Sequence, residues 1–253
     1  MTARRLVEVA PGVLVATSRR YATTSTFVVV GGHVLAVDPA WDPDELAALA
    51  EEAPRPDAGV ATHAHHDHLL WHPGLGDAPR HASATTARLA AERRPQLLAA
   101  LAFPPDLAAL VGAVTPAAAG PLPWDGPDVE LVGHDGHIPG HLAVWIAEKG
   151  LLLAGDMLSD VEIPLLEEGP DPVAAYAGAM DRLAPYVSRA RLLVPGHGSP
   201  TQRPLDRLDA DRRYLDALVA GRPPDDARLA LPGMPDAHAA NMRWLASEEP
   251  SSS

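Results

Sequence analysis

The chain concentrates its candidate metal ligands in one short stretch, THAHHDH at positions 62–68, which ends a predicted strand. In an extended chain, residues two apart point to the same side, so His63 and His65 are expected to converge on one point. Asp67 and His68 then turn toward a neighbouring point. Imidazole and carboxylate groups are ligands for divalent metal ions, and α/β proteins usually bind ligands at the ends of buried strands. The stretch therefore predicts a metal site.

Three further residues, each beside a predicted strand, are candidates to complete this site. They are His141 in IPGHL, Asp156 in LLLAGDM and His197 in LLVPGHGSP. At Asp156 and His197 an apolar run ends at a glycine and a potential ligand, as expected where the backbone passes close to an ion. The chain has no cysteine, so thiolate ligands and a cysteine nucleophile are excluded. Together with the first stretch, these residues give five histidines and two aspartates, enough for two adjacent divalent ions.

The composition restricts the partners that this site can have. The chain has 253 residues, of which 47% are hydrophobic, and a formal charge of -13. This apolar content can fill a core, and the negative charge opposes binding to nucleic acid or anionic membranes. No apolar run approaches the roughly eighteen residues needed to span a bilayer, and the first twenty residues lack the apolar core of a leader peptide. We therefore expect a cytoplasmic protein with a small-molecule substrate, while the oligomeric state stays open.

The order of predicted elements indicates an α/β fold with two similar halves. Four short β-type runs occupy residues 6–40, and a helix follows over 42–52 behind an aspartate cap. The strand that leads into the histidine stretch comes next. From VELVGH to RLLVPGH the second half repeats strands, a helix and a strand. No residue-level repeat accompanies this, so the symmetry is one of architecture alone.

The domain limits follow from changes in composition along the chain. We expect one domain over residues 1–221, interrupted at 84–124 by a helical insertion or lid. Within that insertion, residues 84–113 predict two Ala/Leu-rich helices. A C-terminal extension over 222–253 is expected to contain a short helix and a disordered SEEPSSS tail.

The ordered motifs resemble the metallo-β-lactamase superfamily over roughly residues 6–200. They are an H-x-H-x-D-H stretch, a Gly-His, an aspartate after an apolar strand, and a final Gly-His. The resemblance implies an αββα sandwich with two metal ions in a cleft at one edge of two sheets. Carried over by position, it assigns one metal to His63, His65 and His141, the other to Asp67, His68 and His197, and the bridge between them to Asp156.

Two other histidines lie close to His141 in the segment HDGHIPGH. His141 is expected to be the ligand because it follows a Pro-Gly turn and directly precedes the apolar strand LAVWI. His134 and His137 are then expected not to bind metal. Asp38 and Thr62 are candidates to accept hydrogen bonds from metal-bound imidazoles, which usually donate their remaining N–H to an acceptor.

A site of this kind predicts hydrolysis. Two divalent ions, most simply zinc with iron or manganese as alternatives, lower the pKa of bound water from about 15.7 to about 7. The resulting metal-bridging hydroxide would attack a carbonyl carbon, and Asp67 would steer or carry a proton. Within the superfamily, glyoxalase II-like thioesterases and lactonases fit the length and the acidic charge. We therefore expect a metal-dependent hydrolase of a thioester, lactone or other ester.

Three alternatives remain open beside this expectation. Persulfide dioxygenases of the same fold use one iron held by two histidines and an aspartate, which would correspond to His63, His141 and Asp156. β-Lactam hydrolases fit the metals but normally carry a secretion signal. The third alternative is a metal-binding module without catalytic activity.

The substrate pocket is the least determined part of the site. Leu70, Trp71 and His72 follow the ligand stretch directly, and Met157 follows Asp156, so all four are candidates to line it. An apolar lid over the cleft would suit an acyl or lactone substrate.

Overall fold

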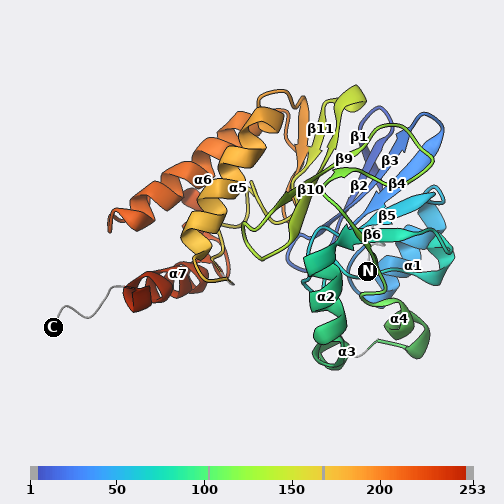
Figure 1. Cartoon of the computed structure of the whole chain (residues 1–253), viewed down its shortest axis with the longest axis horizontal. Helices are drawn as coiled ribbons and strands as arrows, with labels where there is room; N and C mark the ends of the chain where they lie inside the picture. The colour runs from blue at the N-terminus through green and yellow to red at the C-terminus, as the bar shows by residue number, and fades with distance from the viewer. Residues whose placement is uncertain (1–4, 102, 167–168, 249–253) are drawn as a thin grey trace.

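The computed structural model describes residues 5–101, 103–166 and 169–248. In these residues two β-sheets lie face to face with helices on their outer sides, which confirms the predicted αββα sandwich. Figure 1 shows α5 (Pro172–Val187) and α6 (Pro204–Val219) on one side of the sheets and α1 (Pro43–Glu52) on the other. Among the described residues, no helix combines the length and the apolar character that crossing a bilayer requires.

The first sheet contains seven strands in chain order. The first four pair antiparallel, as the predicted meander requires, and the remaining three join in parallel. The strands are β1 (Val7–Ala10), β2 (Val13–Thr17), β3 (Thr24–Val30), β4 (His33–Val37), β5 (Ala58–Val60), β6 (Arg80–Ser83) and β7 (Thr115–Ala117).

The second sheet contains five strands in the order β12-β11-β10-β9-β8. Its antiparallel part runs from β8 to β11, and β12 then pairs in parallel with β11. The strands are β8 (Gly120–Pro121), β9 (Glu130–His134), β10 (His141–Ile146), β11 (Leu151–Leu153) and β12 (Leu192–Val194).

The inner faces of both sheets form the main core. Alternate residues such as Val13 and Val28 point into it, whereas Phe27 points to the opposite face, toward α1. The six residues of β10 are all buried, because one face of the strand contacts the first sheet and the other contacts α5. Burial on both faces explains why this strand is an uninterrupted apolar run after its first residue.

The insertion, described except for residue 102, shows three helices where two were expected: α2 (Ala84–Glu92), α3 (Arg94–Leu101) and α4 (Pro105–Leu110). The extra break falls at Arg93, between α2 and α3. In α2, Leu89 packs against Ala64 of the histidine stretch and Ile138 of the β9–β10 loop. The insertion therefore supports two of the loops that carry candidate ligands.

The C-terminal extension contains a 3-10 turn, η3 (Ala227–Ala230), and the expected helix, α7 (Met234–Glu248). The predicted disordered tail falls largely on residues 249–253, which lie outside the described residues. Two further 3-10 turns are η1 (Pro73–Leu75) and η2 (Ala147–Lys149).

Candidate metal centre

The histidine stretch lies in a loop that is tied to both sheets. β5 already ends at Val60, so strand alternation does not orient His63 and His65 as the sequence analysis assumed. The loop is held because Ala61 N donates to a carbonyl of β6 and Leu142 N of β10 donates to Thr62 O. These two contacts place the stretch at the edge where the sheets meet.

Asp38, which follows β4, fixes the orientation of this loop. Its carboxylate accepts hydrogen bonds from Thr62 N at 2.8 Å, from Thr62 Oγ1 at 2.7 Å and from His68 Nδ1 at 2.9 Å. Thr62 Oγ1 in turn lies 3.0 Å from His63 Nδ1. The structure thus confirms the expected contacts of Asp38 and Thr62 with candidate metal-binding imidazoles.

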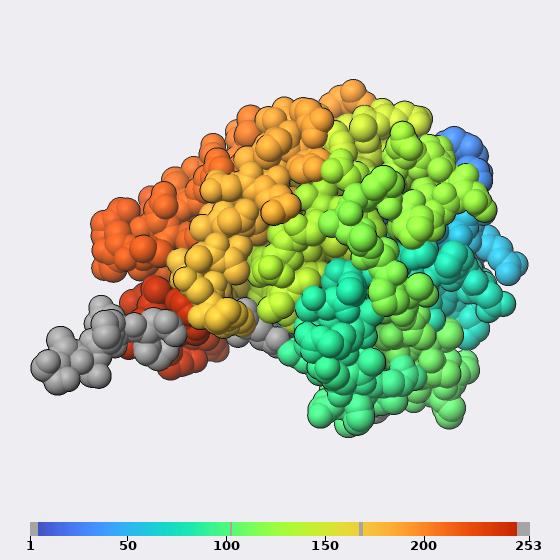
Figure 2. Space-filling view, viewed as in Figure 1, coloured from blue at the N-terminus to red at the C-terminus, as the bar shows by residue number. Residues whose placement is uncertain are grey.

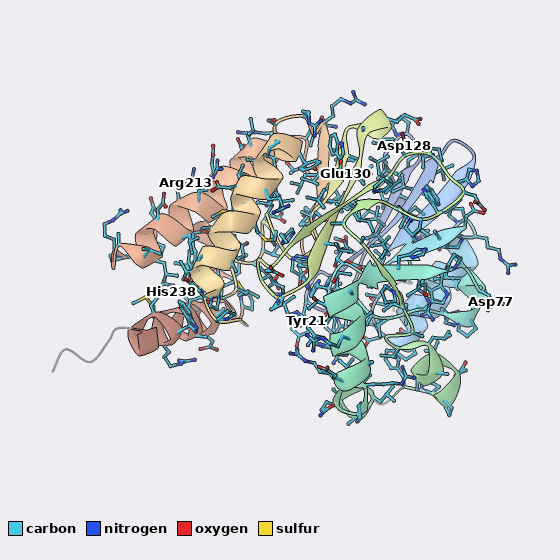
Figure 3. All side chains as sticks on the ribbon, in the orientation of Figure 1. Tyr21, Asp77, Asp128, Glu130, Arg213 and His238 are labelled. Carbon is cyan, nitrogen blue, oxygen red and sulfur yellow. The ribbon has the colours of Figure 1, made fainter. Side chains whose placement is uncertain are left out.

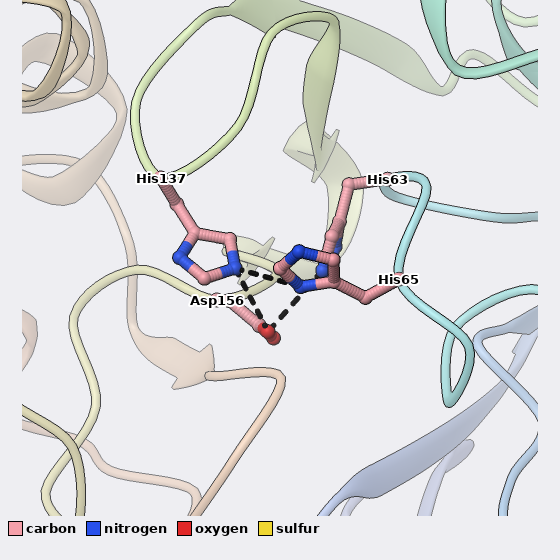
Figure 4. Close-up of side chains that lie close together, drawn as sticks. All are labelled: His63, His65, His137 and Asp156. Atoms are coloured by element: carbon pink, nitrogen blue, oxygen red, sulfur yellow. Dashed lines mark hydrogen bonds and ion pairs between the residues drawn. The ribbon is translucent and has the colours of Figure 1, made fainter. Parts of the chain in front are cut away.

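The first ligand group joins His63, His65, His137 and Asp156, with one ligand atom from each lying within 4.8 Å of the others. Figure 4 shows His63 and His65 entering from one loop and His137 from another, with the carboxylate of Asp156 facing all three rings. Asp156 Oδ2 lies 3.3 Å from His63 Nε2 and 3.4 Å from His137 Nε2. His137 Nε2 is also 3.0 Å from His65 Nδ1.

The second group joins Asp67, His68 and His197. The Nε2 atoms of the two histidines are 3.3 Å apart, and Asp67 Oδ2 lies 3.6 and 3.4 Å from them. Asp156 also reaches this group, with Oδ1 3.2 Å from His68 Nε2 and Oδ2 3.1 Å from His197 Nε2. Asp156 is therefore shared by both groups.

The outward hydrogen bonds determine which ring nitrogen of His68 and of His197 faces the centre. His197 Nδ1 must donate to Tyr21 O at 2.8 Å, because a carbonyl only accepts. His68 Nδ1 donates to the carboxylate of Asp38 in the same way. Neutral forms of these rings then turn bare Nε2 lone pairs toward carboxylate oxygens. Among the described residues, the buried His63 Nε2 and Asp156 Oδ1 have no hydrogen-bond partner. Such a convergence of lone pairs fits divalent cations.

The electrostatics of the centre also favour cations. Burial lowers the pKa of His63 well below its usual value. Burial acts in the same direction on His197, but the carboxylates, Asp156 foremost, raise its pKa to about 10. Burial would raise the pKa of Asp156, yet His197, His68 and His63 hold it well below its usual range. The field that attracts protons to these imidazoles would equally attract a metal ion.

The position expected for His141 in the first group is occupied by His137. His141 is the first residue of β10 and pairs with His134 in the sheet. Both of its ring nitrogens are engaged by backbone: Nδ1 donates to Gly136 O at 3.1 Å, and Nε2 accepts from Asp156 N at 3.3 Å. His137 lies in the turn between the strands, with φ +71°, and reaches the centre. The sequence does contain a signal for His137, because this residue belongs to the earlier of the two Gly-His pairs in HDGHIPGH.

Of the four candidates for the substrate pocket, three are buried in apolar clusters and one caps a turn. Trp71 packs in the core beneath α1 and donates its indole N–H to Gly76 O, and Leu70 packs in a neighbouring apolar cluster. His72 accepts from Gly74 N and thereby caps η1. Met157 is fully buried beneath α5 and α6. The three apolar side chains therefore contribute to the interior, and the histidine stabilises a turn.

Glu162 is a carboxylate near the centre that no sequence motif marked. Its Oε1 lies 3.9 Å from His197 Nδ1, and it can be grouped with Asp156 and His197. Burial raises its pKa to about 7 against the opposing effect of His197. Arg228, from the C-terminal extension, donates to the carbonyls of Glu162 and Ser159 at 2.8 and 3.0 Å. The extension thus holds the loop that follows Asp156.

Comparison with solved structures shows the same fold. The metallo-β-lactamase family protein TTHA1429 from Thermus thermophilus superposes with a TM-score of 0.66 at 23% identity, covering 95% of each chain. TTHA1623, solved in a di-iron-bound form, gives 0.60 at 27% identity over 75% of this chain and 94% of its own. The sec-alkylsulfatase Pisa1 from Pseudomonas sp. gives 0.64 at 16% identity over 85% of this chain, which spans only 42% of Pisa1.

The curated proteins contain no match to this chain. A family profile does match this chain. The profile of the metallo-beta-lactamase superfamily covers residues 19–220, which include both ligand groups and every strand of the two sheets except β1 and β2. The profile spans most of the chain, and the sandwich and the clustered histidines agree with it. This chain therefore belongs to the metallo-β-lactamase superfamily.

Proposed function

We propose that the protein is a dinuclear metal-dependent hydrolase of a small carbonyl substrate, namely a thioester, a lactone or another ester. Family membership and the His/Asp clusters support metal-dependent hydrolysis in general. The proposal of two metal ions rests on the position of Asp156. Its two carboxylate oxygens lie 3.1–3.4 Å from imidazole nitrogens of both ligand groups.

The two groups would divide the metals between them. His63, His65 and His137 would hold one ion and Asp67, His68 and His197 the other, most simply as zinc, with iron or manganese as alternatives. When bound, such ions supply Lewis acidity that makes water nucleophilic near neutral pH and stabilises negative charge on the substrate. The nitrogen and oxygen donors suit any of these metals.

Asp67 would orient the attacking water through its carboxylate. Its Oδ2 accepts a hydrogen bond from Thr23 Oγ1 at 2.9 Å, which holds the side chain in one orientation. The charges of His68 and His197 keep the pKa of Asp67 below its usual value, although burial opposes them. An ionised carboxylate in this position can accept the proton that water releases during attack.

Apolar and aromatic side chains beside the ligand stretch, with Trp41 only 2% exposed, support an acyl or lactone substrate. Trp41 meets His66 edge-on with 4.8 Å between ring centroids, and leucines of α3 pack in the same cluster as Trp41. Tyr21, 64% exposed and labelled in Figure 3, lies 6.3 Å from the Trp41 ring. The charge of -13 disfavours polyanions such as nucleic acid, so a neutral small molecule is the better substrate.

A mononuclear-iron dioxygenase would need only three of these ligands. The second group is as deeply buried as the first, with Asp67, His68 and His197 at 4%, 1% and 5% exposure. Burial of a complete second set favours two ions. A β-lactam substrate would leave the hydrolase assignment intact and change only the substrate class.

Metal analysis combined with a substrate panel tests this proposal. We expect about two metal equivalents per chain and turnover of thioesters or lactones, both lost in Asp156→Ala. Asp181→Asn, at an 81% exposed aspartate, is the matched control and should keep both. One equivalent of iron with oxygen uptake on a persulfide, or turnover of RNA alone, would contradict the proposal.

A further inference from the structure

The C-terminal extension packs against the segment that follows the shared ligand Asp156. The family profile ends at residue 220, so η3 and α7 lie beyond it. Met234 of α7 packs in the same apolar cluster as Met157 and Leu158, the two residues that follow Asp156. Figure 2 shows α7, in dark red, against the side of the molecule that α5 and α6 form. The extension is therefore close to the part of the chain that supplies a ligand to both groups.

Leu158 has a backbone conformation that its own side chain does not favour. Its φ is +62°, in the left-handed region that a leucine rarely adopts. Such a conformation persists where the surrounding contacts impose it. One such contact is with Asp211 of α6, whose Oδ2 accepts a hydrogen bond from Leu158 N at 3.1 Å. Because Leu158 follows Asp156 by two residues, this contact also constrains the backbone from which Asp156 reaches the centre.

Arg228 of η3 holds Asp211 and the same segment together. Its Nη1 lies 2.6 Å from Asp211 Oδ1 and 3.0 and 2.8 Å from the carbonyl oxygens of Ser159 and Glu162. Its Nε and Nη2 donate to the carboxylate of Asp226, which fixes the other edge of the guanidinium. Arg228 is 6% exposed and Asp211 is 1% exposed. A planar guanidinium can serve these acceptors together, whereas the ammonium of a lysine lacks the fork geometry.

Ser159 extends this network to the second ligand group. Its Oγ donates to His197 O at 2.8 Å and accepts from Val161 N and Glu162 N, both at 3.0 Å. The backbone of His197 is thereby tied to the segment that Arg228 holds. The extension is thus connected both to the shared aspartate and to one histidine of the second group.

We infer that Arg228 is a positioning residue for the metal centre, and that docking of the C-terminal extension and binding of metal strengthen each other. This inference rests on the metal binding proposed above. Arg228 belongs to neither ligand group, so its effect would pass through Leu158 and Ser159. Residues that orient metal ligands typically change metal affinity by about 10–100-fold, and the longer path from Arg228 predicts a factor of about ten. Two coupled equilibria change each other by the same factor.

Metal titration of Arg228→Lys tests the inference, because lysine keeps a positive charge beside Asp211. We expect the ion of the second group to bind about tenfold more weakly than in wild type, with a changed visible spectrum when cobalt is bound. Ser159→Ala removes only the link to His197 and should weaken the same ion. Arg94→Lys is the matched control, because Arg94 also donates to several backbone carbonyls, which lie at the end of α4 and outside both ligand groups. It should lower the melting temperature and leave metal affinity unchanged.

Hydrogen exchange and NMR give readouts that need no turnover. In wild type, removing metal should speed amide exchange in η3 about tenfold, and Arg228→Lys should exchange at the faster rate with or without metal. In the metal-free protein, the ring signals of His197 should shift in both Arg228→Lys and Ser159→Ala.

Two results would show a merely structural role and overturn the inference. One is exchange of η3 in wild type that does not depend on metal. The other is unchanged metal affinity in Arg228→Lys together with a lowered melting temperature. If wild type bound no metal, the proposed function would fail, and the His197 signals alone would then decide whether Arg228 positions this histidine.

Discussion

Replacing His137 and His141 separately tests how the structure divides the roles of the two histidines. His137 points Nε2 at Asp156 Oδ2 from 3.4 Å and belongs to the first ligand group. His141 instead holds backbone groups of Gly136 and Asp156 and belongs to no group. We expect His137→Ala to lose metal affinity and His141→Ala to lose stability.

The magnitudes follow from what each side chain contacts. A four-ligand zinc site binds with roughly 10–16 kcal/mol, so removing one ligand costs about 3 kcal/mol, or a factor of roughly 150 in the dissociation constant. His141→Ala leaves an N–H and a carbonyl unpartnered beside a new cavity in a fully buried position, which costs about 3–5 kcal/mol of folding free energy. For a chain of this size that lowers the melting temperature by roughly 6–15 °C.

Competition with a chromophoric chelator measures the first effect, and scanning calorimetry of the chelator-treated proteins measures the second. His238→Ala, in α7 and away from both ligand groups, is the control for affinity. The assignment would be refuted if His141→Ala released metal at an unchanged melting temperature while His137→Ala retained it.

Four further outcomes follow from the same geometry. Asp38→Asn should weaken metal binding about 10–100-fold, because the carboxylate that orients His68 is lost, and equal affinity in chelator titrations would contradict this. Metal affinity should fall about tenfold per pH unit on acidification between pH 9 and 7, because the raised pKa of His197 lets a proton compete with the metal for Nε2. Calorimetry of metal binding in buffers of different ionisation enthalpy should detect the proton that the metal displaces. Arg228→Ala should cost about 3–5 kcal/mol in denaturant unfolding, because it strands Asp211, which is 1% exposed, whereas Arg203→Ala at an exposed pair should cost less than about 1 kcal/mol. Removing metal with a chelator should lower the melting temperature of wild type, because bound metal stabilises only the folded state. The melting temperature of Asp156→Ala should hardly change, because this variant is expected to have lost its metal already.

Local patterns in the sequence were sufficient for most elements of the fold. The alternating runs before Ala40 form the four antiparallel strands β1–β4, and the helix predicted after Asp42 begins at Pro43 as α1. Asp42 itself departs from the expected role, because its carboxylate pairs with Arg19 and Arg20 instead of capping the helix. Strands and helices depend on neighbours in sequence, whereas the partner of a charged side chain depends on what the fold brings near it.

Most candidate metal ligands could also be predicted from local sequence patterns. Histidines and aspartates after apolar strands converge because strand ends in a sandwich meet at common edges. Six of the seven residues chosen from the sequence lie in the two ligand groups, among them Asp156 and His197, which are far from the first stretch along the chain. Their metal binding stays a prediction until metal is measured.

Only the tertiary structure separates His137 from His141. Both follow a glycine within one eight-residue segment, so their local signals are the same, and the register that pairs His141 with His134 decides which one remains in the sheet. The same limit applies to Trp71. Its position in the sequence, just after the ligands, is compatible with either the cleft or the core, and its packing beneath α1 places it in the core. The sequence by itself thus determined that histidines and aspartates are the candidate metal ligands of this protein. The packing of strands and helices distant in sequence decided which side chains reach the centre, because orientation depends on contacts that no local pattern contains.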